Sequence, residues 1–369
     1  MNLTLTKEQL LAGLQAVQNV VSTRTTLPIL SNVLIRADGE RVEFTATDLD
    51  VTVISRVECK ARKAGATTLP VKKIVGIARE LAGLEIELEV DDKNVCAIQS
   101  GPSFFKVRGL AAEEFPPTPT PKDDRKVTLS QEKVRTMLRK TSFAASSDEA
   151  RYVLNGILFS LKEHKLCLVA TDGRRLALVE EEVEASVKSQ GDAIVPSKAV
   201  GELLRVLQDK GEVDISFTEN QAFFNLRDEK GPTVTVITKL IEGNYPNYRQ
   251  VIPAETKERV VLPREEFLHA LRRAEIMTSD KQNSVKLTFS KNSLAITANT
   301  PEVGEARENM AVNYKGRDLA IAFNPLYVIE PLNVLTEDEI TLELIDELSP
   351  GVIKAASPFL YVVMPMRLS

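Results

Sequence analysis

Hydrophobic residues recur along this chain at two alternating spacings, and the alternation is repeated three times. After Leu5, apolar side chains follow one another at the spacing of a helix face, at Leu10, Leu14, Val17 and Val21. Thr6 and Gln9 have the spacing of a capping box, which marks a helix start. Similar helix starts follow Leu129 and Leu262, at offsets of 124 and 133 residues. The pattern predicts three copies of one helical element.

A second helix start, marked by proline, lies deeper in each copy. The three segments are Leu69–Lys72, Val195–Lys198 and Phe323–Leu326, at offsets of 126 and 128 residues. Proline suits this position because the first N–H groups of a helix have no partner within it. Alternating apolar and polar residues, typical of strands, fill the segments between the markers, namely Val33 to Thr47, Ile157 to Thr171 and Val285 to Asn299. Further alternating runs, such as Glu85 to Val90 and Glu339 to Leu344, follow the second marker.

These patterns predict an α+β fold of three tandem domains, each with two helices packed on antiparallel sheets. Turn-rich segments at Phe115–Pro121 and Gly243–Pro253 interrupt the periodicity between the repeats. We therefore expect domain 1 at residues 1–123, domain 2 at residues 124–253 and domain 3 at residues 254–369.

The composition is that of a folded globular protein, with 43% hydrophobic and 27% charged residues. The three cysteines are far apart and outside any metal-type or disulfide-type spacing, so we expect them to be core residues. No metal site is expected, because His164 and His269 have no partner at ligand spacing. The chain has no phosphate-binding loop, so no cofactor is expected. It also has no leader-like N-terminus and no run of 18 apolar residues, which predicts a cytoplasmic protein.

Charge is divided unequally between the predicted helices and the rest of the chain. The whole chain has 47 Lys and Arg against 52 Asp and Glu, but the six helical segments have 13 against 8 and the remainder 34 against 44. Such a chain would attract a polyanion to its helical faces alone. The helical cations are Lys72, Lys73, Arg79, Lys133, Arg135, Arg139, Lys140, Lys198 and Arg205. They suit contacts with the phosphates of double-stranded DNA without reading of its sequence, although helix surfaces favour Lys and Arg in other proteins too.

Three segments carry a family resemblance that extends over essentially the whole chain. Together with the triplication, Arg151–Gly156, Ala170–Leu176 and the tail Tyr361–Leu368 resemble the bacterial DNA polymerase III beta subunit, the replicative sliding clamp. The resemblance implies that the chain forms half of a closed ring, a head-to-tail homodimer of six similar domains with helices lining the hole. It implies a processivity factor that encircles duplex DNA and tethers the replicative polymerase, with no catalysis of its own. The other partners it implies are the clamp-loader ATPase and further clamp-binding-motif proteins of replication and repair.

The resemblance also implies three sets of site residues. Arg24, Lys72, Arg151 and Tyr152 match family positions that contact DNA, and they add to the helical cations. The implied partner-peptide pocket, between the second and third domains, consists of Leu154, Thr171, Gly173, Arg174, Arg175, Leu176, Pro246, Val251, Val363, Met364, Pro365, Met366 and Arg367. Methionines suit such a pocket because their flexible, polarisable side chains adapt to different peptides. The implied dimer contact consists of Phe105, Ile276 and Met277.

Two other functions stay open on the residues alone. The same ring could serve as a peptide-binding scaffold outside replication, or Asp48 and Asp172 could be the paired carboxylates of a hydrolase. Because both Asp residues lie in equivalent Ala-Thr-Asp turns of separate repeats, turn formation is the preferred interpretation. Retention on circular but not on linear DNA would distinguish a clamp from both alternatives.

Overall fold

The computed structural model describes residues 1–21, 27–120, 126–184, 191–279 and 283–367. Within these ranges one order of helices and strands occurs three times, with two α-helices in each repeat. The sheets are antiparallel. The predicted α+β class with three tandem repeats is therefore confirmed.

The elements of each repeat follow one another in the same order, except that the first repeat has one additional strand, β5, which has no counterpart in the described residues of the other two. The first repeat contains β1 (Asn2–Thr6), α1 (Lys7–Val17), β2 (Asn32–Asp38), β3 (Arg41–Thr47), β4 (Val51–Glu58), β5 (Lys60–Lys63), β6 (Gly65–Pro70), α2 (Val71–Glu80), β7 (Glu85–Val90), β8 (Val95–Ser100) and β9 (Ser103–Arg108). The second contains β10 (Lys126–Ser130), α3 (Gln131–Thr141), β11 (Gly156–Lys162), β12 (Lys165–Thr171), β13 (Arg175–Glu182), β14 (Gly191–Pro196), α4 (Ser197–Val206), β15 (Glu212–Phe217), β16 (Gln221–Asp228) and β17 (Gly231–Lys239). The third contains β18 (Glu258–Pro263), α5 (Arg264–Glu275), β19 (Val285–Ser290), β20 (Ser293–Thr300), β21 (Gly304–Ala311), β22 (Leu319–Phe323), α6 (Pro325–Val334), β23 (Glu339–Leu344), β24 (Gly351–Lys354) and β25 (Phe359–Val363). Short 3-10 helices are η1 (Pro28–Ser31), η2 (Ala112–Glu114), η3 (Ser142–Ala144), η4 (Glu149–Leu154) and η6 (Tyr248–Val251).

The helices begin where the sequence pattern places their starts. At α1, the Thr6 hydroxyl accepts a hydrogen bond from the Gln9 N–H at 3.1 Å, and the Gln9 side chain accepts one from the Thr6 N–H at 2.8 Å. At α6, the Asn324 side chain accepts from the Leu326 N–H at 3.0 Å. Both caps satisfy N–H groups that no helical carbonyl can reach. The three predicted strand pairs between the markers are the hairpins β2–β3, β11–β12 and β19–β20.

The chain divides into two compact units, and this division does not follow the repeats. Unit 1 comprises residues 1–135 and 183–241, and unit 2 comprises residues 136–182 and 242–369. The reason is that sheets continue from one repeat into the next. The predicted domain boundaries at 123/124 and 253/254 stay a prediction, and the first of them lies outside the described residues.

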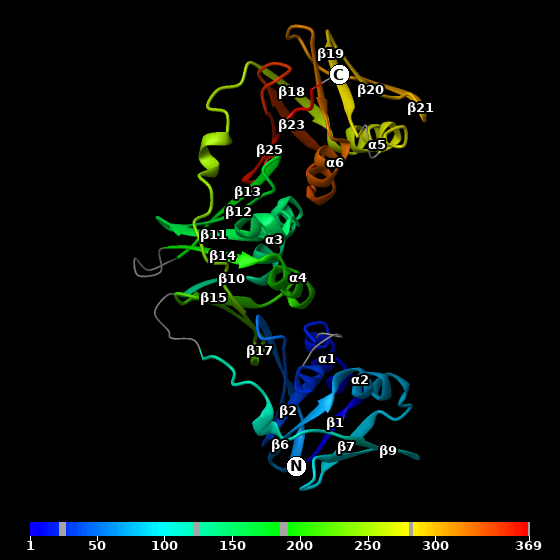
Figure 1. The fold of residues 1–369 in the computed structure, drawn as a ribbon, viewed down its shortest axis with the longest axis vertical. Helices are drawn as coiled ribbons and strands as arrows, with labels where there is room; N and C mark the ends of the chain where they lie inside the picture. The colour runs from blue at the N-terminus through cyan, green and yellow to red at the C-terminus, as the bar shows by residue number, and fades with distance from the viewer. Residues whose placement is uncertain (22–26, 121–125, 185–190, 280–282, 368–369) are drawn as a thin grey trace. The chain divides into compact units, whose positions relative to one another are not determined.

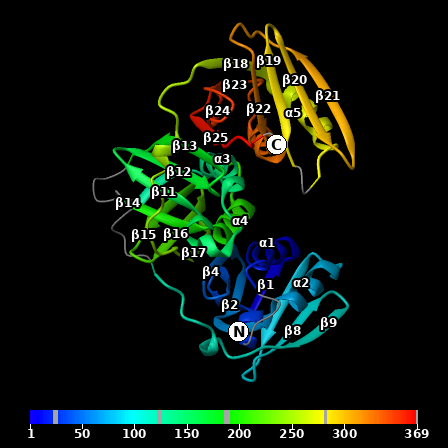
Figure 2. The same cartoon turned by 45° about the horizontal axis from the view of Figure 1, so that its top comes forward.

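Each unit contains a sheet that joins strands of two repeats. In unit 1, β4 of the first repeat pairs with β17 of the second, within the order β10-β15-β16-β17-β4-β3-β2-β6 (Figures 1 and 2). In unit 2, β13 of the second repeat pairs with β25 of the third, within the order β11-β12-β13-β25-β24-β23-β18. Two smaller sheets, β5-β1-β7-β8-β9 and β21-β20-β19-β22, end on β9 and on β21.

The helices of each repeat cover sheet surfaces. In unit 1, α1 lies beside α2 and packs on β3 and β4, and in unit 2, α5 lies beside α6 and packs on β20 and β21 (Figures 1 and 2). Gly13 allows the close approach of α1, because a Cβ atom there would lie 2.5 Å from Cδ2 of Phe44. All three cysteines are buried, as predicted. No helix in the described part of the chain is long and apolar enough to cross a membrane.

Candidate functional site

The α2 helix in unit 1 presents three cations on the side opposite its packed face. The buried side chains of this helix are Val71, Ile74, Val75 and Ala78. Lys72, Lys73 and Arg79 are exposed. At the C-terminal end of α2, the Lys7 ammonium donates hydrogen bonds to the carbonyls of Arg79 and Leu81, at 2.8 and 2.6 Å. The α2 surface therefore combines high positive charge with accessibility, which suits a phosphate backbone.

Both cations of α4 are held by acidic partners. The Lys198 ammonium pairs with the Asp48 carboxylate, and Nη1 of Arg205 donates to Oε1 of Glu202 at 2.5 Å. Glu202 is only 5% exposed, and burial raises its pKa although Arg205 and Lys198 oppose that shift. A DNA phosphate would have to compete with two carboxylates at this helix. The α4 helix therefore contributes less positive charge than its Lys and Arg content indicates.

One cation of α3 points into the protein. Lys140 is 6% exposed, and its ammonium donates to the Ser357 hydroxyl at 2.8 Å and lies 3.4 Å from Oε1 of Glu337. Arg139 is exposed, and Arg135 is half-buried in an ion pair. The expectation that the helical cations face outward is therefore wrong for Lys140. The reason is that this residue lies on the side of α3 that packs against loops of the third repeat.

Of the other predicted DNA contacts, the structure describes Arg151 and Tyr152 but not Arg24. Arg24 lies outside the described residues, so its contact stays a prediction. Arg151 and Tyr152 lie in η4 and are exposed, Tyr152 to 57%. Nη1 of Arg151 donates to the Asp172 carbonyl at 3.0 Å, so Arg151 also holds the turn that contains Asp172. The Tyr152 ring is accessible for stacking or for a phosphate contact.

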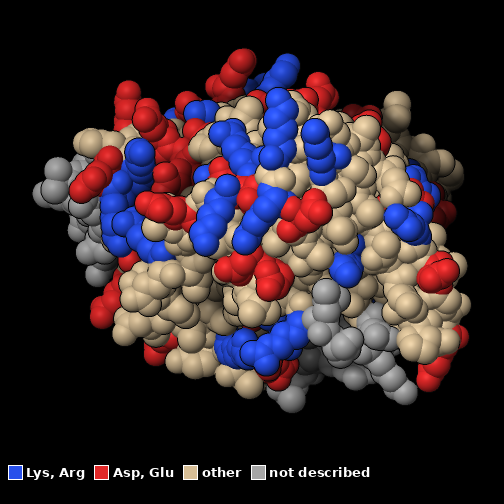
Figure 3. All heavy atoms as spheres, turned by 90° about the horizontal axis from the view of Figure 1, so that it is seen from above, with Lys and Arg blue, Asp and Glu red and all other residues tan. Residues whose placement is uncertain are grey.

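Basic and acidic side chains are mixed on the surface. On the face shown in Figure 3, Lys and Arg side chains lie among Asp and Glu side chains. Ion pairs at the surface, such as Arg273 with Glu308 at 2.6 Å, also bring opposite charges together. Paired surface charges largely cancel at a distance. A polyanion would therefore respond to individual helices such as α2 and not to the average surface.

In unit 2, the turn and tail residues of the predicted peptide pocket lie side by side. The turn Thr171–Arg175 connects β12 to β13, and Oδ1 of Asp172 accepts from the N–H groups of Arg174 and Arg175 at 2.8 and 3.1 Å. Beside it, β25 pairs with β13 so that Val363 lies opposite Arg175. The chain then leaves the sheet with the Met364 N–H donating to the Arg174 carbonyl at 2.9 Å. Turn and tail are thus held together by backbone hydrogen bonds.

The pocket residues differ in accessibility. Leu154, Leu176 and Val363 are buried. The residues with large exposed apolar surface are Met364 at 42%, Met366 at 37% and, in η6, Val251 at 48%. The remaining positions from the linker, the turn and the tail are Pro246, Thr171, Gly173, Arg174, Arg175, Pro365 and Arg367. The structure therefore brings all thirteen predicted residues of the pocket into unit 2.

Arg175 is a supporting residue beneath the site. Its side chain is 9% exposed and donates to Oδ2 of Asp172 at 3.0 Å and to the Phe143 carbonyl at 2.7 Å. It also pairs with the Glu330 carboxylate, and its guanidinium carbon lies 4.5 Å from the centre of the Tyr327 ring. The sequence did not single out these partners. The one available signal was that Glu330 is the only charged residue of α6.

A separate pocket of about 630 Å³ lies beside this site in unit 2. It is lined by β13, by the linker after η6 and by the segment from β24 to β25, with Leu178, Ile252 and Leu360 among its side chains. None of the predicted peptide-pocket residues lines it. The predicted site is therefore a surface around Met364 and the Thr171–Arg175 turn, distinct from this cavity.

The predicted dimer residues lie at sheet and helix ends. Phe105 is on β9, the last strand of its sheet, and is 38% exposed. Ile276 follows α5 directly and is 71% exposed, and Met277 is half-buried. Phe105 and Ile276 are therefore not core residues of this chain, because both present apolar surface to solvent.

Nothing in the described residues favours a hydrolytic site. Oδ1 of Asp48 accepts from the N–H groups of Asp50 and Val51 at 3.1 and 2.8 Å, as Asp172 does in its own turn. Both carboxylates thus stabilise turns, as the sequence interpretation preferred. Within the described ranges, no three His, Cys, Asp or Glu side chains gather as a metal ion would require.

Comparison with protein families matches the chain in three consecutive parts. The N-terminal domain of the DNA polymerase III beta subunit matches residues 1–119, the central domain matches residues 128–247 and the C-terminal domain matches residues 249–367.

Individual relatives and solved structures match over the full length. The beta sliding clamp of Chlamydia muridarum is 34% identical over 368 residues, covering 100% of this chain and 99% of that protein, and the beta sliding clamp of Pseudomonas putida is 35% identical with full coverage of both. The crystal structure of the DnaN sliding clamp from Bartonella birtlesii, bound to griselimycin, is similar at a TM-score of 0.93 and 36% identity. The DNA polymerase III subunit beta of Pseudomonas aeruginosa is similar at a TM-score of 0.93 and 34% identity. Each of the two structures is covered completely, as is this chain.

Proposed function

Because this chain belongs to the DNA polymerase III beta subunit family, the bacterial sliding clamps, we propose that two copies close head to tail into a ring around duplex DNA. The chain is a DNA sliding clamp, a processivity factor of DNA polymerase III, and is not itself an enzyme. Its partners are DNA and the polymerase. We further propose a homodimer, specific residues that contact DNA and a pocket for partner peptides. We also propose a clamp-loader ATPase as a partner and a cytoplasmic location.

The repeat order of the sheets carries the head-to-tail proposal. Strands β4, β13 and β21 hold the same position in the three repeats, and so do β9, β17 and β25. Within the chain, β4 pairs with β17 and β13 pairs with β25. The pairing that would continue this series joins β21 to β9 of another copy, and these two strands end the two smaller sheets. Such an interface is heterologous and generates a ring when the rotation closes.

The exposed apolar residues near these edges support the same contact. Phe105 lies on β9, and Ile276 follows the helix α5 that packs on β21. An unpaired strand edge readily accepts another strand. Pairing β9 with β21 would cover both edges and bury apolar side chains beside them.

The ring proposal is tested by topology and mass. A clamp loaded on nicked circular DNA should be retained, and linearising the DNA should release it, because a ring slides off an end. Mass measurement in solution should give a dimer. Equal retention on circular and linear DNA, or a monomer mass at micromolar concentration, would contradict the proposal. The chain has no ATP-binding loop of its own, so we assign ring opening to a separate clamp-loader ATPase.

DNA contact is proposed chiefly for the α2 surface. Lys72 and Arg79 are seven residues apart, which places them on one face of the helix two turns from each other. Lys73 lies beside them, and Arg139, Arg151 and Tyr152 supply further exposed groups from the second repeat. Lys198 and Arg205 are proposed as weaker contacts because each already has a carboxylate partner. Such contacts neutralise phosphates without reading bases.

Replacing Lys72 and Arg79 together by Ala should flatten the salt dependence of DNA retention. Each lost phosphate contact lowers the slope of log K against log salt by about 0.9, so a decrease of about 2 is expected. The measurement is clamp retention on nicked circular DNA at several salt concentrations. Lys60→Ala with Lys63→Ala, which removes two exposed cations from β5, serves as the matched control. Identical slopes in the α2 variant and the parent chain would exclude these contacts.

Partner recognition is proposed for the surface around Met364. Exposed Met364, Met366 and Val251 provide apolar contact area, and the buried Leu176 and Val363 fix its base. Flexible methionines allow peptides of different sequence to bind. Short motifs of the polymerase, the clamp loader and repair proteins would insert apolar anchors here.

Replacing Met364 and Met366 by Ala should weaken binding of a clamp-binding-motif peptide by about tenfold to a hundredfold. The loss of buried apolar contact amounts to about 1.4 to 3 kcal/mol. Fluorescence anisotropy of a labelled peptide measures it. The solution mass of the variant should stay that of the parent, since neither residue lies at β9 or β21. Unchanged peptide affinity would remove this pocket assignment.

A further inference from the structure

The Thr-Asp turns of the first two repeats have the same construction. In Thr47–Leu49 and in Thr171–Gly173, the threonine hydroxyl accepts from the N–H two residues later, at 3.1 Å in both turns. In each turn, Oδ1 of the aspartate accepts from the N–H groups two and three residues after it. The third residues, Leu49 and Gly173, have φ of +78° and +85°. The two turns therefore have one conformation.

The neighbouring strands continue this equivalence. The Lys239 N–H, at the end of β17, donates to the Asp50 carbonyl at 2.9 Å. The Met364 N–H, after β25, donates to the Arg174 carbonyl at the same distance. Lys239 therefore occupies, at the junction of the first two repeats, the position that Met364 has at the junction of the last two. The first junction has the framework of the proposed peptide pocket with different side chains.

The linkers at both junctions begin with an aromatic residue and a proline, and then they diverge. After Tyr245-Pro246 the chain forms η6, in which Val251 is 48% exposed. After Phe115-Pro116 it continues as Pro117-Thr118-Pro119. Phe115 is 7% exposed and anchors this segment. Prolines favour an extended, preorganised conformation of the kind that grooves bind in proline-rich ligands.

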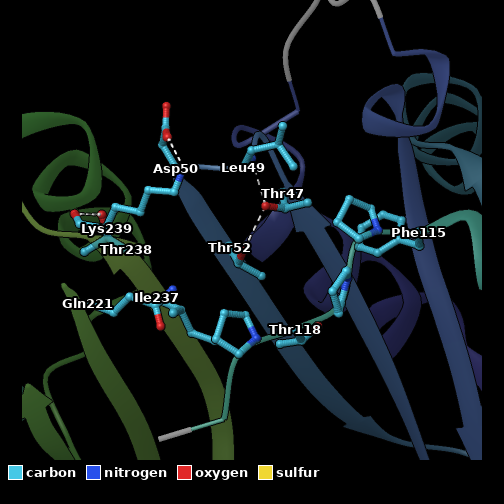
Figure 4. A pocket seen from close by; sticks show the side chains of 13 residues that line it. Thr47, Leu49, Asp50, Thr52, Phe115, Thr118, Gln221, Ile237, Thr238 and Lys239 are labelled. Atoms are coloured by element: carbon cyan, nitrogen blue, oxygen red, sulfur yellow. Dashed lines mark hydrogen bonds and ion pairs between the residues drawn. The ribbon is translucent and has the colours of Figure 1, made fainter. Parts of the chain in front are cut away.

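The proline-rich linker lies in the groove of the first junction. The turn, β17 and linker residues Phe115–Pro119 together line a pocket of about 80 Å³. Figure 4 shows Phe115 on the side of Thr47 and Thr118 on the side of Ile237. The remaining space fits only a few water molecules. The chain's own linker thus forms one wall of this pocket and leaves little free space beside the turn and β17.

The backbone conformation of Leu49 is a second observation, beside the bound linker, that indicates a recognition site. A leucine is disfavoured at φ of +78°, where Gly173 stands in the other turn. The Leu49 side chain nevertheless lines the pocket and is 46% exposed. Strained residues that the surrounding structure retains are typical of binding sites.

We propose that the junction of the first and second repeats is a peptide-recognition groove and that Phe115–Pro119 is its resident peptide. The comparison with Met364 rests on the proposed partner pocket, whereas the groove and its occupant do not. On this proposal, the difference between the two linkers explains why only the junction of the second and third repeats would bind partner peptides. The first linker fills its groove, and the second leaves its groove accessible.

The test supplies the linker peptide in trans. A chain carrying Phe115→Ala, Pro117→Gly and Pro119→Gly should bind a fluorescein-labelled synthetic peptide with the sequence of residues 113–120, at least tenfold more tightly than the parent chain does. Adding Leu49→Gly to this variant should weaken binding at least tenfold, and adding Met364→Ala with Met366→Ala should leave it unchanged. Those two controls separate this groove from the partner pocket, so either site can fail without the other.

Two outcomes of this binding experiment would overturn the proposal. One is equal binding of the peptide to parent and variant, and the other is no binding to a variant whose thermal unfolding shows a folded chain. If the triple variant does not fold, Pro117→Gly with Pro119→Gly retains the Phe115 anchor. That chain should then show faster proteolysis within the linker than the parent, and an unchanged rate would equally overturn the assignment.

Discussion

Replacing Phe105 and Ile276 by Asp should convert the dimer into monomers at micromolar concentration. Both residues expose apolar surface next to the strand edges that we propose to pair, Phe105 at 38% and Ile276 at 71%. Placing unpaired carboxylates in a buried apolar contact costs several kcal/mol, and a loss of about 4 kcal/mol weakens association about a thousandfold. Analytical ultracentrifugation over a concentration series measures the dissociation constant.

The control for this prediction changes a residue away from the edges. Leu84, in the loop before β7, is 84% exposed, and Leu84→Asp places one carboxylate on the surface without changing β9 or β21. It should dimerise as the parent does. A double variant of Phe105 and Ile276 that dimerises as tightly as the parent would show that the copies meet elsewhere. The double variant of Phe105 and Ile276 should also lose retention on circular DNA, because a monomer does not encircle the DNA.

Acidification should destabilise unit 2 through Glu337. Burial alone would raise the pKa of this carboxyl, but hydrogen bonds from the Ser357 hydroxyl and from backbone N–H groups, together with the Lys140 charge, lower it from 4.5 to about 2. A carboxyl whose folded-state pKa is depressed stabilises the fold above its unfolded pKa. That stabilisation, about 3 kcal/mol from the size of the shift, is lost as the pH falls from 4.5 towards 2.

Two substitutions separate this network from general acid unfolding. Glu337→Gln should reduce the pH dependence of the free energy of unfolding between pH 5 and 2, as measured by urea denaturation. Lys140→Met should destabilise the chain at pH 7 by about 3 kcal/mol, because it leaves a largely buried carboxylate without its cation. Glu347→Gln, an exposed glutamate of the third repeat, is the control. A pH profile of Glu337→Gln that matches the parent profile would contradict this role.

Local signals in the sequence predicted the elements of the fold. The capping box at Thr6, the prolines before α2 and α4 and the alternation of Glu85–Val90 each depend on residues close in sequence, and each lies where the pattern placed it. The equivalence of the Asp48 and Asp172 turns was predictable for the same reason. These features are encoded over a few residues, so a single sequence is enough to find them.

Features that depend on distant partners were not predictable from the pattern. The pairing of β4 with β17 joins two repeats, and the alternation of apolar and polar residues in one strand does not predict which strand is its partner. The sequence pattern predicts Lys140 to be an outward-facing cation of its helix. Its burial depends on contacts with Glu337 and Ser357 of the third repeat, which are distant in sequence. In the same way, the partners of Lys198 and Arg175 determine whether those charges are accessible. The residue types at the candidate site were therefore predictable, whereas their pairing was not.

The sheet that crosses from the first repeat to the second also bears on how the protein is made. Strand β4 leaves the ribosome about 180 residues before its partner β17. At a translation rate of roughly 5 to 20 residues per second, β4 has no pairing partner for about 10 to 40 s. During that interval the nascent N-terminal segment carries an uncovered edge to which chaperones, or neighbouring nascent chains on the same polysome, have access.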